Sequence, residues 1–158
     1  MRLSRAALIR GASPLATLLL YGVSLSLPAI AVNGRSGAAP VPGYEAVIAG
    51  VFALVMLFQP AVLANPAIWT GLVLLACGRW RSAAVAGALA VVLTLSALLI
   101  YDPAAPPQGG GADSPSTHPP RIIQLLPGYY CWVASAAILT AAGVLGMRGR
   151  YTAIQENE

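Results

Sequence analysis

Long apolar runs separated by short polar or Pro/Gly-rich stretches make up most of this sequence. A membrane-spanning helix needs about 20 mostly apolar residues, and three uninterrupted segments meet that requirement. They are residues 12–32, 82–101 and 122–147. In the last of them, the helix itself is expected to start after Pro127–Gly128. The pattern predicts an all-α polytopic membrane protein whose single integral membrane domain covers residues 1–158.

A fourth apolar region, residues 43–78, is interrupted by "QPAVLANP" at 59–66. A continuous helix over this region would be about 54 Å long, whereas one crossing of the hydrocarbon core needs ~30 Å. Pro60 removes a backbone donor, and Pro66 disfavours the helical conformation at Asn65. We therefore expect one net crossing by two helical pieces joined at 59–66, one of them tilted along the outer interface or inserted as a half-helix. Five short spans are the alternative to these four net crossings.

Arginine clusters predict the orientation, because short cytoplasmic loops are enriched in basic residues. The clusters are Arg2, Arg5 and Arg10, then Arg79 and Arg81, and finally Arg148 and Arg150. Placing all of them inside makes both termini cytoplasmic, including the tail 148–158. Residues 32–42 and the loop 102–121 are then outside, and the region 43–78 must cross an odd number of times.

The first span also has features of a signal peptide. The start "MRLSRAALIR" is basic, and "AIA" at 29–31 resembles a signal-peptidase site. The apolar run is longer than the usual hydrophobic region of a signal peptide. An uncleaved signal anchor is therefore favoured over a cleaved signal peptide.

Composition supports a membrane environment. The chain is 58% hydrophobic and only 9% charged, against about 25% charged residues in a typical soluble domain. The net charge of +4 comes from arginines spread along the chain, a distribution that does not indicate a nucleic-acid partner. The expected location is the bacterial inner (plasma) membrane. The expected partners are the lipid bilayer and either further copies of the chain or another membrane protein.

Ionisable residues are absent from the middle of every predicted span. Glu45 and Asp102 lie only at outer ends and are candidate outer-face carboxylates; Glu45 is suited to complement the dipole of a following helix. Buried charges in spans usually mark function, and the small multidrug transporters, similar in size, depend on a carboxylate in their first span. The polar side chains of the first span here are Thr17, Tyr21, Ser24 and Ser26.

The interruption at 59–66 is the main candidate site. Its residues Gln59, Pro60, Asn65 and Pro66 form a candidate hinge or polar site. Carbonyl groups freed by the prolines must find partners because lipid offers none, and the Gln59 and Asn65 amides are placed to supply them. Transporters bind substrates at such broken helices, which is the alternative interpretation.

No set of residues indicates catalysis or metal binding. His118 is the only histidine, lies in a Pro/Gly-rich loop and has no cysteine near it in sequence. Serine without a basic partner is not an activated nucleophile. Cys77 and Cys131 are expected to be buried thiols near opposite membrane faces. We expect no enzyme, no cofactor and no metal.

Aromatic and small residues predict helix borders and contacts. Tyrosine and tryptophan favour the headgroup level, so those at span ends are expected to be interfacial anchors. They are Tyr44, Tyr101, Tyr129, Tyr130 and Trp132 outside and Trp80 inside. Pairs of small residues four apart allow close helix packing. They are Ala83/Gly87, Ala86/Ala90, Ala137/Ala141 and Ala142/Gly146.

Several short motifs together resemble a group of small uncharacterised bacterial inner-membrane proteins. They are "SLSLP" at 24–28, "GYEA" at 43–46, "ANP" at 64–66 and "YYCWVAS" at 129–135. Aromatic residues often precede "ANP" in that group, and Val62 and Leu63 depart from this pattern. The resemblance implies a membrane protein and no particular activity. We expect a non-enzymatic integral membrane protein, an accessory or scaffold subunit, with a small transporter or channel component as the alternative.

Overall fold

The computed structural model describes the backbone of residues 5–34, 37–57, 60–103 and 122–155. The described part is mostly helical, as the sequence predicts. In chain order, its elements are α1 (Arg5–Ser26), β1 (Pro28–Gly34), β2 (Gly37–Pro42), α2 (Gly43–Leu57), the 3-10 helix η1 (Pro60–Leu63), α3 (Ala64–Ala76), α4 (Trp80–Leu95), the 3-10 helix η2 (Ser96–Ile100), β3 (Ile122–Leu125) and α5 (Pro127–Gln155).

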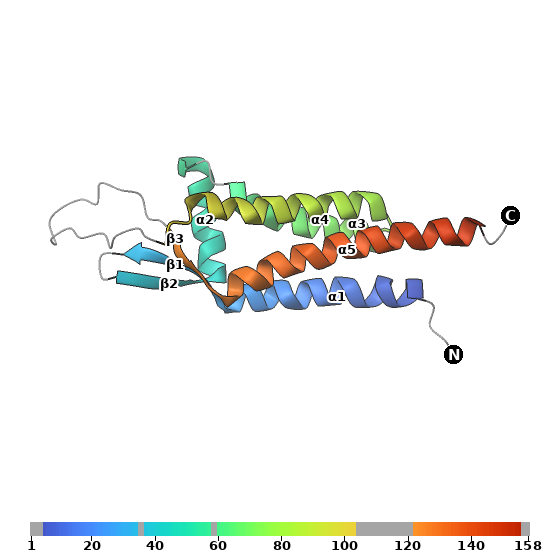
Figure 1. The fold of residues 1–158 in the computed structure, drawn as a ribbon, viewed down its shortest axis with the longest axis horizontal. Coiled ribbons are helices and arrows are strands. Elements are labelled where there is room, and N and C mark those ends of the chain that lie inside the picture. Colours follow the sequence, from blue (N-terminus) through green and yellow to red (C-terminus); the bar gives the residue numbers. More distant parts are fainter. Residues whose placement is uncertain (1–4, 35–36, 58–59, 104–121, 156–158) are drawn as a thin grey trace.

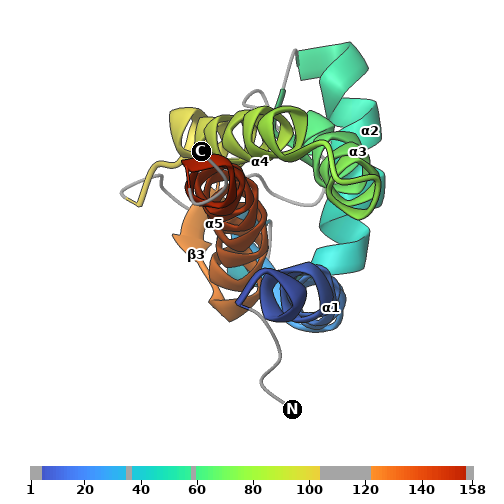
Figure 2. The same cartoon turned by 90° about the vertical axis from the view of Figure 1, so that its right-hand side faces the viewer.

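Four helices, α1, α3, α4 and α5, run along the long axis of the molecule (Figure 1). Helix α2 is perpendicular to them and lies across one end of the bundle, from α1 towards α3, as both views show (Figure 2). The strands project from that same end, and both chain termini lie at the opposite end. We call these two ends the sheet end and the terminal end.

A three-stranded antiparallel sheet in the order β2-β1-β3 corrects the all-α prediction. The central strand β1 pairs Ala31 with Pro40 of β2 on one side and with Gln124 of β3 on the other. Pro28 lacks a backbone donor and cannot continue α1, so the polar backbone beyond it pairs in the sheet. Helix α1 thus ends at Ser26 rather than near residue 32. Residues 122–125 form a strand, and α5 begins at Pro127, close to the expected start of the last helix after Pro127–Gly128.

The region 43–78 forms two separate helical pieces, but the interruption differs from the predicted one. Helix α2 ends at Leu57 and η1 begins at Pro60, so residues 60–66 belong to η1 and α3 rather than to an irregular joint. Residues 58–59 lie outside the described part. Asn65 and Pro66 belong to the first turn of α3, which corrects the expectation that Pro66 removes Asn65 from the helix. Proline is tolerated there because the backbone N–H groups in the first turn of a helix have no hydrogen-bond partner within that helix.

A tight turn brings α3 and α4 together as antiparallel neighbours at the terminal end. Gly78 has a φ of 72°, a left-handed conformation that glycine adopts without steric cost. The Gly78 N–H donates to the Leu75 carbonyl over 3.0 Å, and the Arg79 N–H donates to the Leu74 carbonyl over 2.9 Å. The turn ends α3 and places Arg79 and Arg81 beside the start of α4.

Small residues let α4 and α5 approach closely in the core. A Cβ atom at Gly87 would lie 2.7 Å from the Thr140 backbone nitrogen, and one at Gly143 would lie 2.6 Å from that of Ala84. Ala142 is also buried in this core, whereas the predicted pair Ala137/Ala141 is exposed. Larger side chains fill the space towards α3, where Ile68 and Leu139 are fully buried.

Candidate functional site

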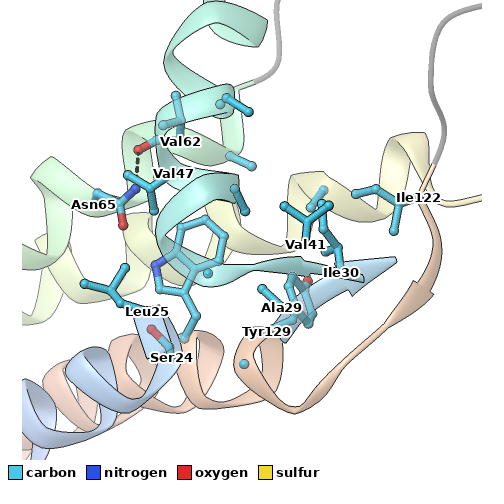
Figure 3. A pocket seen from close by; sticks show the side chains of 18 of the residues that line it. Ser24, Leu25, Ala29, Ile30, Val41, Val47, Val62, Asn65, Ile122 and Tyr129 are labelled. Carbon is cyan, nitrogen blue, oxygen red and sulfur yellow. Dashed lines mark hydrogen bonds between the residues drawn. The ribbon is translucent and has the colours of Figure 1, made fainter. Parts of the chain in front are cut away.

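Asn65 satisfies the backbone that Pro66 leaves without a donor. In a regular helix, the amide of residue 66 would donate to the carbonyl four residues earlier, which belongs to Val62. Proline has no N–H, and the Asn65 Nδ2 donates to the Val62 carbonyl instead, over 3.2 Å (Figure 3). The side chain thus does what the sequence predicted for it. Gln59, for which the same role was expected, lies outside the described residues.

The second partner of Asn65 is Tyr21 on α1. The Tyr21 hydroxyl donates to Asn65 Oδ1 over 3.0 Å, and both side chains are buried. The Tyr21 ring also meets Trp69 edge to face, with the ring centroids 5.9 Å apart. Sequence reasoning recorded Tyr21 as polar but did not pair it. The available signal was that a tyrosine inside an apolar span needs a hydrogen-bond partner for its hydroxyl.

Buried hydroxyl groups elsewhere in the bundle bond to their own helices. Thr17 donates to the Ser13 carbonyl over 2.9 Å and Ser24 to the Tyr21 carbonyl over 2.6 Å. Other donors follow the same local pattern. They are Thr94, which donates to the Ala90 and Val91 carbonyls, and Ser135, which donates to the Trp132 carbonyl. These buried hydroxyl groups are therefore satisfied by carbonyl groups of their own helices.

The two candidate carboxylates lie at the sheet end. Glu45 is exposed in the first turn of α2, where its charge complements the helix dipole as expected. Its Oε1 accepts a hydrogen bond of 3.0 Å from the Tyr44 hydroxyl. This bond and the nearby negative charge raise the pKa of Tyr44 above its ordinary value. Asp102 follows η2, and its backbone N–H donates to the Ile122 carbonyl over 2.8 Å, beside β3.

An apolar cavity of about 340 Å³ lies at the sheet end. Its wall combines side chains from every element there, including Leu25 of α1, Val47 of α2 and Ile122 of β3 (Figure 3). Asn65, Ser24, Tyr129 and Trp132 contribute the polar groups of the wall. We call this space the interhelical cavity. No single stretch of sequence contains enough of its lining to predict it.

Two of the aromatic residues expected to be interfacial anchors are buried instead. Trp80 is 5% exposed and packs its ring against α5 at Gly146, where a Cβ atom would overlap the ring. Tyr129 is 4% exposed, and its hydroxyl donates to the Thr94 carbonyl over 3.1 Å. Tyr44 and Tyr130 are exposed at the sheet end, as anchors would be. Close helix contacts thus bury Trp80 and Tyr129, although both residue types favour a membrane interface.

The cysteines and acidic residues form no metal-binding group within the described ranges. No three His, Cys, Asp or Glu side chains come together there, and His118 lies outside these ranges. Cys77 and Cys131 are free thiols at opposite ends of the bundle. Cys77 is exposed, which corrects the expectation that both thiols are buried.

Comparisons with known proteins leave the site to be interpreted from its own geometry. No model of a protein family matches the chain, and neither a curated protein nor a solved structure matches it.

Proposed function

We propose that the chain is a non-enzymatic integral protein of the bacterial inner membrane that crosses the bilayer four times and serves as an accessory or scaffold subunit. Two described helices are long and apolar enough to span a membrane, Trp80–Leu99 and Pro127–Arg148. Only 39% and 28% of their apolar windows are buried. Most of each helix therefore faces outward, unlike the core helix of a soluble protein.

The other two crossings are assigned to α1 and to η1 together with α3. Helix α1 has 22 residues, which gives a length of about 33 Å. The 4 residues of η1 and 13 of α3 give about 27 Å, close to the ~30 Å of a hydrocarbon core. Large apolar side chains are exposed on both segments, such as Leu19 at 61% and Val73 at 61%. Helix α2, which is perpendicular to the bundle, fits the outer interface.

Thiol labelling tests this topology. Two single-cysteine variants are needed. Cys131→Ser leaves Cys77 as the thiol at the terminal end. Cys77→Ser/Cys131→Ser/Ala39→Cys places a single thiol at the exposed position 39 of β2, at the sheet end. A membrane-impermeant maleimide should label the cysteine at position 39 in intact spheroplasts. Cys77 should react only after permeabilisation, because its neighbours Arg79 and Arg81 belong inside. Equal labelling of both thiols before permeabilisation would contradict the four-crossing topology.

One observation favours a scaffold over a transporter: Asn65, the polar side chain of the break that the structure describes, already has hydrogen-bond partners. The Asn65 carbonyl oxygen accepts from the Tyr21 hydroxyl, and the Asn65 amide nitrogen donates to the Val62 carbonyl. A substrate would have to replace these bonds inside an apolar interior, where an unmade hydrogen bond costs ~1–3 kcal/mol. The break therefore fits a structural joint between α2 and α3.

Paired variants of this joint test the assignment. Asn65→Ala and Tyr21→Phe break the same hydrogen bond from its two sides. For a scaffold, any growth defect of either variant in a deletion strain should follow the abundance of the protein in the membrane. Measurement therefore combines growth under solute stress with immunoblotting. A solute-specific defect of Asn65→Ala at normal abundance, with Tyr21→Phe unaffected, would instead identify a transport site.

A further inference from the structure

We propose that the interhelical cavity binds one lipid acyl chain, whose carbonyl oxygen accepts a hydrogen bond from the Trp132 indole. The inference rests on the proposed membrane location and adds a specific ligand to it. The cavity, of about 340 Å³, falls within the ~300–1,000 Å³ range of small-molecule sites. Such sites are mostly apolar with a few placed polar groups, which also describes this one.

Among the polar side chains of the wall, Trp132 is the one whose nitrogen makes no hydrogen bond within the described part of the chain. Ser24 donates to the Tyr21 carbonyl, Tyr129 donates to the Thr94 carbonyl, and Asn65 is bonded on both sides. The Trp132 Nε1 differs from them: it is buried and has no hydrogen-bond partner among the residues that the structure describes. A buried donor without an acceptor costs free energy. A ligand that brings one acceptor into the cavity would remove that cost.

Water is a poor occupant of this site. A buried water molecule is typically held by two to four polar partners, whereas the lining of this cavity is almost entirely apolar. An oxygen attached to a hydrocarbon chain is held differently, since the chain gains from the surrounding apolar wall while the oxygen accepts from the indole. The required ligand is therefore an apolar chain with a single carbonyl.

The position of the cavity matches an acyl chain of a bilayer lipid. The cavity lies at the sheet end, where α2 crosses the bundle and where Tyr44 and Tyr130 are exposed. Exposed tyrosines favour the headgroup level of a membrane, which places the wall near the depth of lipid ester groups. Val47 of α2 and Leu25 of α1 line the space (Figure 3), and both would contact the hydrocarbon.

Native mass spectrometry of the purified, delipidated full chain tests the proposal. The probes are a phosphatidylglycerol with ester-linked oleoyl chains and its ether-linked analogue, which keeps the chains but lacks the carbonyls. One ester-linked lipid per protein should remain bound at collision energies that remove all other lipid molecules. The ether analogue should bind about tenfold more weakly, the effect of losing one hydrogen bond. Trp132→Phe should abolish this difference.

A matched pair of variants locates the bound chain. Val47→Phe adds a ring inside the cavity, whereas Val51→Phe makes the same change on an α2 residue that is 55% exposed and does not line the cavity. The first should lose the retained lipid, and the second should keep it. Oleate offered as a competitor reports whether a free fatty acid displaces the phospholipid.

Clear results overturn the proposal. Equal retention by both valine variants, or no lipid retained by the wild type, excludes the cavity as a lipid site. Equal binding of ester and ether lipids by the wild type excludes the Trp132 contact. Val47→Phe is judged to be folded by its elution profile and circular dichroism. If it does not fold, the proposal is still tested by whether Trp132→Phe abolishes the difference between ester and ether lipid binding. The four-crossing topology is tested separately, because thiol labelling does not depend on whether a lipid is bound in the cavity.

Discussion

Gly143→Leu should destabilise the protein by about 3 kcal/mol and sharply reduce its amount in the membrane. A Cβ atom at this position would lie 2.6, 2.7 and 2.8 Å from the backbone nitrogen, Cα and Cβ of Ala84. These atoms belong to the facing helix, so no side-chain rotation relieves the overlap and α4 must move away from α5. Overpacking of this kind typically costs ~1–3 kcal/mol or more, out of a total stability of ~5–15 kcal/mol.

Gly22→Leu is the matched control. Gly22 is also a helical glycine, but no atom of another helix or strand lies within 4 Å of a Cβ built there. The control should be neutral or stabilising by up to ~1 kcal/mol, because leucine has the better helix propensity. Equilibrium unfolding in mixed micelles, followed by circular dichroism, measures both variants. Equal stability of Gly143→Leu and Gly22→Leu would mean that α4 and α5 do not pack as described.

Asn65→Ala should cost about 2–4 kcal/mol, and Pro66→Ala should remove part of that cost. The alanine leaves both the Tyr21 hydroxyl and the Val62 carbonyl without their partner, at ~1–3 kcal/mol for each unsatisfied buried group. Replacing Pro66 restores a backbone N–H that can donate to Val62 directly. The Asn65 amide then becomes redundant for that carbonyl.

A double-mutant cycle measures this substitution of one donor for another. Asn65→Ala should cost ~1 kcal/mol less in the Pro66→Ala background than in the wild type. Tyr21→Phe provides the control, since its own cost should be unchanged by Pro66→Ala. An additive cycle, in which Asn65→Ala costs the same in both backgrounds, would show that the Val62 contact contributes nothing to stability.

Local proline chemistry made the helix break largely predictable. The position of Pro60 and Pro66 in an apolar run implied two helical pieces and freed carbonyl groups, and Asn65 supplies the expected donor. The helical conformation of Asn65 itself was not expected. The preference of a residue before proline is modest, and the preceding 3-10 helix η1 already directs the chain into α3.

Contacts between distant segments explain what the sequence did not reveal. Asn33–Gly34, a residue pair common in hairpin turns, was a local signal for the hairpin of β1 and β2, but both residues lie in β1 and pair with Ala38 and Gly37 of β2. The pairing of Ala31 with Gln124 had no such signal. Trp80 is buried rather than interfacial because Gly146 on another helix makes room for its ring. The interhelical cavity likewise depends on how seven or more elements meet.

The pairing of the two ends of the chain has a consequence for biosynthesis. Helix α1 is made before the other described elements, but its most extensive contacts are with α5, which is made after them, and β1 obtains its second neighbour only when β3 has been made. Until then, the face of α1 that packs against α5 has no partner, and one edge of β1 is open. Contacts of such large sequence separation form slowly. The newly made protein therefore remains incomplete, and exposed to quality control, until α5 has packed against α1 and β3 has paired with β1.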